Sequence, residues 1–371
     1  MSASTSTFTP ASPDTSPDTS PDTCPDTCPD TSMQALVCHQ FGAPHEVVSL
    51  QSMDRPGQPL GAHQARIAVA YANVSHATGL LIEGRYQRRP PLPFVPGTEG
   101  VGRVLECGSA VQHLQPGDAV AFIADWGAFA QETVVHASTV YRLPAGMPWL
   151  QALPIALSYG TAYTALHWRA RLQEGDVVLV LGAGSGVGAA AVEVARQTPG
   201  VQVIACASTE AKRADALRRG AHQAATPQDL AAQVKQATQG RGASLVFDPV
   251  GGDLLLQALR AAAQNAQLLS VGFASGAIPA VPMNLALVKN LTLHGFFYGR
   301  YIGWTPADER QAFAAQLQPV IATLLDWAAR GCIHPQVSQV FAMHELPEAL
   351  HALHGRNVTG KLALAIQGDK V

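Results

Sequence analysis

The residues best suited to chemistry lie at 182–188, where four glycines alternate with Ala183, Ser185 and Val187. Glycine lets the backbone approach a ligand closely, and free N–H groups at the start of a helix bind phosphate. An apolar run, Val177–Leu181, precedes this turn, and an alanine-rich helical run, Ala189–Arg196, follows it. Strand, glycine turn and helix in that order predict a dinucleotide-binding site. Its predicted contacts are Gly184, Ser185, Gly186, Val187 and Gly188.

The end of the second predicted strand indicates which dinucleotide binds. An NAD site places an acidic residue about 20 positions after the glycine turn, where it binds the ribose 2′-hydroxyl. Here Ser208 and Thr209 follow the strand, and Lys212 and Arg213 come one turn later. Hydroxyls and cations suit the 2′-phosphate of NADPH. Two other interpretations stay open: Glu210 could face a ribose, and the two cations could be solvated helix residues.

Length and composition bound the class of protein. With 371 residues, 47% of them hydrophobic and 14% charged, the chain suits a two-domain globular enzyme. A net charge of −3 without a basic block argues against nucleic acid as a partner, and no apolar run approaches the roughly 18 residues of a membrane span. Six scattered cysteines form neither a disulfide framework nor a metal-binding pair, which predicts a cytoplasmic location.

The N-terminus is a tetrapeptide repeat at residues 12–31, SPDT three times and then CPDT twice. Proline at every fourth position excludes a helix, and nothing in the repeat can bury a core. We therefore expect residues 1–32 to be a disordered tail and the ordered chain to begin at Met33. Either Met33 is the natural start, or the tail is a dispensable extension.

Beyond the tail, two patterns divide the chain. Residues 33–155 alternate short apolar strands with turns, at Gln34–His39, Val47–Leu50, Ala65–Tyr71, Gly100–Glu106, Ala119–Phe122 and Ala130–Val135. Residues 156–298 alternate apolar strands with helices, which predicts a doubly wound parallel sheet of the Rossmann type. Its predicted strands are Val177–Leu181, Gln202–Ala207, Ser244–Phe247, Leu268–Phe273 and Leu291–Gly295, and its helices are Thr209–Arg219, Pro227–Thr238 and Asp253–Ala263. Residues 299–371 hold a long helix, 306–330, and a last strand, 360–365, which we expect to return to the first domain.

A series of motifs gives the chain a family resemblance. They are VCHQFGAP at 37–44, EGRY at 83–86, PPLPFVPGTEGVGRV at 90–104, GDAVAF at 117–122, YGTAYTAL at 159–166, FDPVGG at 247–252, VGFASG at 271–276 and TGKLAL at 359–364. From Met33 onward the chain resembles the zinc-independent medium-chain dehydrogenase/reductases, in the NADPH:quinone oxidoreductase branch. The resemblance implies an α/β fold with a GroES-like catalytic domain, discontinuous at 33–155 and 299–371, and a Rossmann domain at 156–298. It also implies NADPH as cofactor and a homodimer joined through the edges of the nucleotide-binding sheets.

The resemblance also bears on metal binding. Zinc-dependent relatives carry a catalytic cysteine, a histidine and a third ligand, and the corresponding positions here are Ser75, Thr98 and Leu157. Neither Thr98 nor Leu157 can supply a thiolate, an imidazole or a carboxylate, so we expect no catalytic zinc. The four-cysteine lobe of those relatives is missing as well, because only Cys107 falls in the region.

Without a metal, hydride transfer needs hydrogen-bond donors aimed at the developing oxyanion. In the resembling family the tyrosine of EGRY faces the substrate, so Tyr86 is the predicted proton donor, with a packing role as the alternative. Ser75 and His76 replace the family's usual asparagine and aromatic residue, and Thr78 replaces its aspartate. Ser75 is the second catalytic candidate, because its hydroxyl can bind a carbonyl. His76 can relay a proton or serve only in packing.

Further cofactor contacts are predicted at the ends of strands and at the start of the helix that links the two domains, near residue 161. Ligands of an open α/β sheet bind outside the carboxyl ends of its strands. Asp248 and Val250 follow one strand, and Phe273, Ala274 and Ser275 end the next. The resemblance adds Thr161 as a nicotinamide contact. Phe297, Tyr298 and Trp304 form either an apolar wall for a flat substrate or part of a dimer interface.

These observations predict an NADPH-dependent reductase of quinones or α,β-unsaturated carbonyls. One alternative is a 2-enoyl-CoA reductase, for which Arg85, Arg88 and Arg89 would bind the phosphates of coenzyme A. Another is a sensor that binds NADPH with little catalysis, which the departures at Ser75 and Thr78 suggest.

Overall fold

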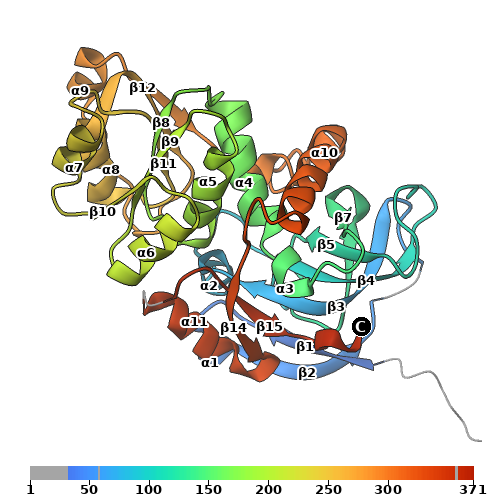
Figure 1. Ribbon diagram of the computed structural model, residues 1–371. Coiled ribbons are helices and arrows are strands. Elements are labelled where there is room, and N and C mark those ends of the chain that lie inside the picture. Colours follow the sequence, from blue (N-terminus) through green and yellow to red (C-terminus); the bar gives the residue numbers. More distant parts are fainter. Residues whose placement is uncertain (1–31, 57–58, 356–357) are drawn as a thin grey trace, which may run out of the picture. The chain divides into compact units, whose positions relative to one another are not determined.

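The structure is a computed structural model that describes residues 32–56, 59–355 and 358–371. The predicted N-terminal tail lies outside these residues, apart from Ser32, which begins the first strand, β1 (Ser32–Cys38). Within the described part, one mixed sheet and one parallel sheet carry the residues of interest, together with the β1–β2 pair (Figure 1).

A six-stranded parallel sheet forms the predicted Rossmann part of the chain. Its strand order is β10-β9-β8-β11-β12-β13. Its strands are β8 (Val177–Val180), β9 (Gln202–Cys206), β10 (Gln223–Ala225), β11 (Ala243–Asp248), β12 (Ala262–Ser270) and β13 (Thr292–Gly295). The order reverses between β8 and β11. In open α/β sheets, ligands bind at the carboxyl ends of the strands on either side of such a reversal.

Helices connect these strands and make the central ones inaccessible. They are α5 (Gly186–Arg196), α6 (Glu210–Arg218), α7 (Leu230–Ala237), α8 (Gly252–Ala261) and α9 (Met283–Val288). All four residues of β8 are buried, as expected for a parallel strand covered on both faces. Three small residues of α5, Ala189, Ala190 and Ala191, are also buried, which lets the helix lie close to the sheet.

Strand β12 differs from the prediction at both ends. It begins at Ala262, six residues before the predicted start at Leu268, and ends at Ser270 rather than Phe273. The helix before it stops at Ala261, because Lys289 Nζ donates to the carbonyls of Leu259, Arg260 and Ala262. Beyond Ser270 the chain turns back along the loop after β11, so Phe273 lies in a loop.

A seven-stranded sheet forms most of the predicted GroES-like part. Its order is β14-β15-β3-β4-β5-β7, and β6 pairs with β3. The strands are β3 (Gln64–Val74), β4 (Glu99–Cys107), β5 (Ala119–Ile123), β6 (Glu132–His136), β7 (Val140–Arg142), β14 (Val337–Ala342) and β15 (Lys361–Ala365), and β1 pairs separately with β2 (Val48–Asp54). The short helices α1 (Pro44–Val47), α2 (His76–Ile82) and α3 (Trp149–Ala152) connect or follow these strands.

The C-terminal segment returns to this sheet, as expected. After the long helix α10 (Arg310–Ala329), strand β15 pairs antiparallel with β3, with Leu362 opposite Val74. Helix α11 (Leu346–His354) lies between β14 and β15 in the sequence. The register places Lys361, the first residue of β15, close to the end of β3 that Ser75 follows. The domain boundaries at 155/156 and 298/299 stay predictions.

Candidate cofactor and substrate site

The glycine turn is shaped for close packing and for an anion. A Cβ atom on Gly188 would lie 2.2 Å from the carbonyl oxygen of Gly182, so only glycine fits there. Gly182 itself has a φ of 59°, which favours glycine. Ser185 caps α5, since its Oγ accepts a hydrogen bond from the N–H of Gly188 at 3.2 Å. The helix therefore starts at Gly186 with its first N–H groups at the turn, which is the arrangement that binds phosphate.

Two lysines lie over this turn, and one of them comes from a distant part of the chain. A Cβ on Gly184 would lie 2.6 Å from Cδ of Lys212, and a Cβ on Gly186 would lie 2.7 Å from Cε of Lys361. The two glycines therefore leave room for lysine side chains. The sequence predicts Lys212 as a contact, whereas Lys361 enters the sequence analysis only as a residue of the TGKLAL motif. With two lysine side chains packed beside a helix N-terminus, the turn is suited to a polyanion.

Lys361 also contacts a buried carboxylate. Its Nζ lies 3.7 Å from Oε2 of Glu99, which is fully buried. Oε1 of Glu99 accepts a hydrogen bond from the N–H of Leu157 at 3.0 Å. Burial raises the pKa of Glu99, and the charge of Lys361 opposes that rise. The lysine thus connects the glycine turn with the strand β4 of the other sheet.

The hydroxyl groups and cations predicted near the end of β9 have different partners in the structure. Ser208 is exposed, and Thr209 caps α6 by accepting a hydrogen bond from the N–H of Lys212 at 3.3 Å. This cap sets Lys212 in the first turn of α6, facing Gly184. Arg213 instead donates from Nη1 to the carbonyl of Ala207 at 3.1 Å. Of the two cations, the structure therefore brings Lys212 to the turn.

The end of β11 abuts the same turn. Asp248 is buried, and its Oδ1 accepts hydrogen bonds from the N–H groups of Val250 and Gly251, both at 2.8 Å. Among the described residues its Oδ2 has no hydrogen-bond partner, and burial raises the pKa of this carboxyl group. Val250 lies against Gly182, with Cγ2 2.6 Å from where a Cβ would be.

The loop after β12 joins this edge. The N–H groups of Ala274 and Ser275 donate to the carbonyls of Pro249 and Val250, at 3.1 and 3.0 Å. Phe273 is 42% exposed, and its Cδ1 lies 2.8 Å from the Cβ position of Gly251. Phe273, Ala274 and Ser275 therefore stand beside Val250, in an accessible loop.

Thr161 belongs to the same connected group. It lies in α4 (Gly160–Tyr163), between two π-helical segments, Ile155–Tyr159 and Thr164–Arg169. Its Oγ1 donates to the carbonyl of Leu157 at 2.6 Å. Because the N–H of Leu157 binds Glu99, a chain of contacts runs from Thr161 through Glu99 to Lys361 and the glycine turn.

Ser75 has a structural partner that the sequence reasoning missed. It is the N-cap of α2 and forms a capping box with Thr78, in which each hydroxyl accepts from the other residue's N–H at 3.3 Å. The two hydroxyls are 3.1 Å apart. The spacing Ser-x-x-Thr before an apolar run was the available signal. His76 is the exposed first residue of the helix.

Tyr86 lies in the loop after α2. Its N–H donates to the carbonyl of Leu80 at 3.1 Å, and its side chain is partly buried. Burial raises the pKa of the phenol above its usual value, and the charge of Arg88 opposes the rise. No described residue forms a hydrogen bond with its hydroxyl. The hydrogen bonds of Ser75 and Tyr86 stay within residues 75–88, so they do not tie these residues to the glycine turn.

The positions that hold zinc in zinc-dependent relatives do not fit a metal here. Ser75 is committed to the capping box, Thr98 is a buried hydroxyl, and Leu157 is apolar. Across residues 32–371, outside the two short undescribed gaps, no group of three His, Cys, Asp or Glu side chains converges as metal ligands. Zinc independence stays a prediction, which rests on the residue types at these three positions.

Of the three predicted aromatic wall residues, two are in the core. Tyr298 and Trp304 are 5% and 7% exposed, whereas Phe297 is 39% exposed. The Tyr298 hydroxyl donates to the carbonyl of Ala156 at 3.2 Å. Tyr298 therefore packs against the π-helical segment Ile155–Tyr159 and does not offer a free face to a substrate.

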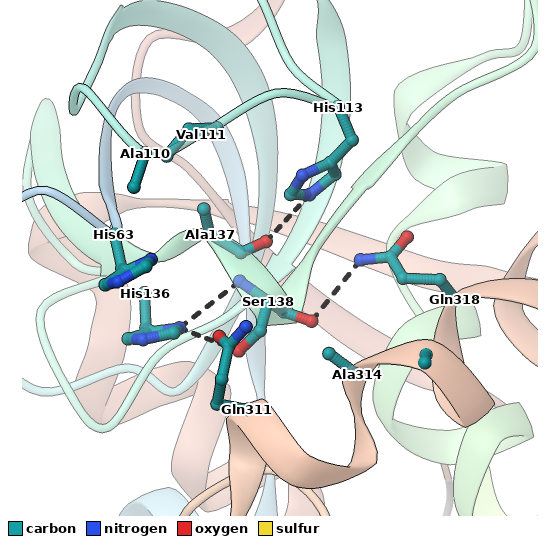
Figure 2. Close-up of a pocket in the computed structure, with 11 residues that line it drawn as sticks. His63, Ala110, Val111, His113, His136, Ala137, Ser138, Gln311, Ala314 and Gln318 are labelled. Atoms are coloured by element: carbon teal, nitrogen blue, oxygen red, sulfur yellow. Dashed lines mark hydrogen bonds between the residues drawn. The ribbon is translucent and has the colours of Figure 1, made fainter.

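A pocket of about 170 Å³ lies elsewhere, between loops of the seven-stranded sheet and α10 (Figure 2). It is lined by His63, His113 and His136 with Ala110, Val111, Ala137, Ser138, Gln311, Ala314, Ala315 and Gln318. His136 Nδ1 accepts from the N–H of Ser138, and His113 Nε2 lies 3.0 Å from the carbonyl of Ala137. None of the predicted site residues lines this pocket, and His63 precedes β3 whereas Ser75 follows it.

Comparisons with known proteins agree with this architecture. Residues 61–145 match the alcohol dehydrogenase GroES-like domain, and residues 186–317 match the family described as zinc-binding dehydrogenase. The fold and these two matches define a medium-chain dehydrogenase/reductase with a GroES-like and a Rossmann domain.

Relatives place the chain within that class. It is 33% identical over 336 residues to the rat quinone oxidoreductase-like protein 2, covering 90% of this chain and 92% of that protein. A solved probable oxidoreductase from Mycobacterium abscessus has a TM-score of 0.78 at 29% identity, covering 90% of this chain and 99% of that one. The Escherichia coli quinone oxidoreductase solved in complex with NADPH has a TM-score of 0.78 at 24% identity, covering 90% and 99%.

The chain therefore belongs to the quinone oxidoreductase branch of the medium-chain dehydrogenase/reductases. It is an oxidoreductase of the quinone-reductase type, and its glycine turn fits a nicotinamide cofactor. In the described part of the chain, no helix is both long and apolar enough to cross a bilayer.

Proposed function

We infer that this protein is a zinc-independent, NADPH-dependent reductase that transfers hydride to a quinone or an α,β-unsaturated carbonyl. The carrying observation is the glycine turn with Lys212 and Lys361 laid over Gly184 and Gly186. The E. coli quinone oxidoreductase of the same fold was solved with NADPH, which supports the choice of cofactor. In this proposal residues 156–298 bind the cofactor, and residues 33–155 and 299–371 bind the acceptor.

The residues that would hold NADPH fall into groups according to the part of the cofactor that each would contact. The N–H groups of Gly186 and Val187 and the side chain of Lys361 suit the pyrophosphate, because the N–H groups of Ser185 and Gly188 are bound within the turn. Ser208, Thr209 and Lys212 suit the 2′-phosphate. Val250, Phe273, Ala274 and Ser275 border the nicotinamide end with Thr161 and Asp248. Bound NADPH supplies a hydride.

The acceptor side relies on hydroxyl groups. As negative charge develops on the acceptor oxygen, Tyr86 donates its phenolic proton to that oxygen. Its raised pKa keeps the phenol protonated at neutral pH. Ser75 Oγ holds the acceptor carbonyl through its O–H while its lone pair accepts from Thr78. Because Ser75, Thr98 and Leu157 cannot hold a zinc ion, the residues must polarise this oxygen by hydrogen bonds alone.

The structure gives the coenzyme A alternative little support. Arg85 pairs with Glu83, Arg88 pairs with Asp125, and the guanidinium of Arg89 lies 4.7 Å from the ring centroid of Phe41. All three arginines therefore have partners within the protein, and a phosphate would have to displace them.

A homodimer through the parallel sheet is part of the proposal. Strand β13 is an edge of that sheet, and an edge strand offers unpaired N–H and C=O groups. Beside it, Met283, Leu287 and Val288 of α9 are 66%, 75% and 59% exposed. An apolar patch next to an open edge suits a second copy of the same chain.

The test is NADPH oxidation at 340 nm in buffer with EDTA, with 1,4-benzoquinone, an enone and crotonyl-CoA as acceptors and NADH as control. Turnover that survives EDTA and prefers NADPH supports the proposal. Saturable turnover of crotonyl-CoA alone would favour the enoyl-CoA reductase, and NADPH binding without any turnover would favour the sensor.

A further inference from the structure

Arg88 connects the loop that carries Tyr86 to two distant parts of the chain. We propose that Arg88 is a positioning residue that holds Tyr86 in place for proton donation to the acceptor. The inference rests on the proposed function, since it concerns the proton donor of that reaction. It does not assign Arg88 any contact with substrate.

The guanidinium of Arg88 is enclosed by three side chains. Its Nη2 donates to Oδ1 of Asp125 at 2.8 Å, and only 19% of the side chain is exposed. Its central carbon lies 5.4 Å from the ring centroid of Trp126 and 5.3 Å from that of Trp304. A guanidinium over an aromatic ring is attracted by the electrons of the ring face, and more strongly when it is desolvated. Arg88 is therefore fixed from several sides at once.

The anchor of Arg88 is itself held. Asp125 also accepts from Nη2 of Arg310 at 2.9 Å, and the Arg310 side chain is 8% exposed. Arg310 binds Oδ1 of Asp308 at 2.6 Å and the carbonyl of Gly303 at 3.2 Å. Two guanidinium groups and two carboxylates balance in this cluster. Arg88 thus has its charge satisfied and serves to hold the loop rather than to bind an anion.

Tyr86 sits between two fixed points. On one side, the N–H groups of Arg85 and Tyr86 both donate to the carbonyl of Leu80 at the end of α2, at 2.8 and 3.1 Å. On the other side, Arg88 is locked by Asp125 and the two indoles. The Tyr86 hydroxyl has no hydrogen-bond partner among the described residues, so the acceptor can take it. An error of about 1 Å in such a group can cost on the order of 100-fold in rate.

Arg85 supplies a matched control. It lies in the same loop, one residue before Tyr86, but its side chain is 72% exposed and pairs with Glu83 at 3.0 Å. It makes no contact with Asp125, Trp126 or Trp304. Arg85→Met therefore removes the same charge from the loop without removing the anchor.

The experiment is a double-mutant cycle on NADPH oxidation with the best quinone or enone acceptor. We expect Arg88→Met to lower kcat by roughly tenfold when Tyr86 is present, and by less than about twofold in the Tyr86→Phe background. The Kd for NADPH should not change, and Arg85→Met should leave kcat unchanged in both backgrounds. Arg88→Lys keeps the charge but not the planar contact, so we expect it to recover part of the kcat lost in Arg88→Met.

Equal losses of kcat from Arg88→Met in both backgrounds would overturn the inference, because they would show a structural effect independent of Tyr86. If Arg88→Met fails to fold, the same cycle with Arg88→Lys decides, and a loss of equal size with and without Tyr86 overturns the inference. Wild-type protein that reduces no acceptor would instead refute the proposed function.

Discussion

At the scale of the residue, a substitution of Tyr86 tests whether this phenol is the proton donor. We expect Tyr86→Phe to lower kcat by roughly 100-fold, the lower end of what a general acid contributes, with the Kd for NADPH unchanged. Burial raises the pKa of the phenol. A donor must be protonated, so the alkaline fall in kcat that is due to Tyr86 should lie at a higher pH than for an ordinary tyrosine. Steady-state kinetics of both proteins across pH measure this, and an unchanged kcat would remove Tyr86 as the donor.

A substitution of Lys212 tests whether this residue makes the protein prefer NADPH to NADH. A charge-assisted hydrogen bond contributes about 1.5–3 kcal/mol, so Lys212→Met should raise the Kd for NADPH by about tenfold or more and leave that for NADH almost unchanged. Arg213→Met is the control, because the Arg213 guanidinium donates to the carbonyl of Ala207. Fluorescence titration of both cofactors measures the ratio. A similar rise for NADH would show that Lys212 does not bind the 2′-phosphate.

At the scale of the element, the strand, turn and helix around Gly188 form one unit. A Cβ on this residue would lie 2.2 Å from the carbonyl oxygen of Gly182, so Gly188→Ala must push α5 away from β8. We expect a loss of about 1–3 kcal/mol in the free energy of unfolding, the range for overpacking, and loss of cofactor binding.

Gly79→Ala is the control for that prediction. Gly79 also lies in a helix, but the nearest atom to its Cβ position is Leu350 Cδ2, at 3.8 Å. Denaturant unfolding and NADPH titration compare the two variants. If Gly188→Ala binds NADPH as tightly as the wild type, the turn does not hold the phosphates.

The same elements show what could be predicted from the sequence. The order of strand, turn and helix is local, so residues 177–196 were sufficient to predict β8, the turn and α5. The two ends of β12 could not be predicted in this way. Its start depends on Lys289 capping α8, and its end depends on the return of the chain over Pro249. A pattern of apolar residues carries no information about such caps from a later helix.

The contact of Lys361 with the glycine turn also could not be predicted from local sequence patterns. It reaches Gly186 because β15 pairs with β3, and this pairing joins residues almost 290 positions apart. Ser75 shows the opposite case, in which the signal was present but was interpreted differently. Its spacing to Thr78 is that of a helix cap, and the structure shows this role.

At the scale of the whole molecule, a buried ionic cluster fixes the return of the chain from one sheet to the other. Arg219 at the end of α6 binds Glu193 of α5 and Asp215, each at 2.7 Å. It also donates to the carbonyl of His334 and to Gln336, which precede β14. Since β14 pairs with β15, this cluster helps to place Lys361 over the glycine turn.

The exposed apolar surface beside β13 belongs to the same scale and predicts the state of assembly. Met283 and Leu287 are four residues apart, so they lie on one face of α9, and Leu293 of β13 is 41% exposed. Burying such side chains contributes about 25 cal/mol per Å² of apolar surface. The protein should therefore elute with light scattering at twice the 38.9 kDa of one chain.

Leu287→Arg places a charge in that face and should yield monomers, because an unpaired charge cannot be buried cheaply. Leu217→Arg is the control: Leu217 is 47% exposed on α6, away from β13 in the sheet order, and this variant should stay dimeric. Each monomer carries its own glycine turn, Lys212 and Lys361, so Leu287→Arg should keep NADPH affinity. A wild-type protein that elutes as a monomer, or a Leu287→Arg variant that stays dimeric, would show that this face is not the interface.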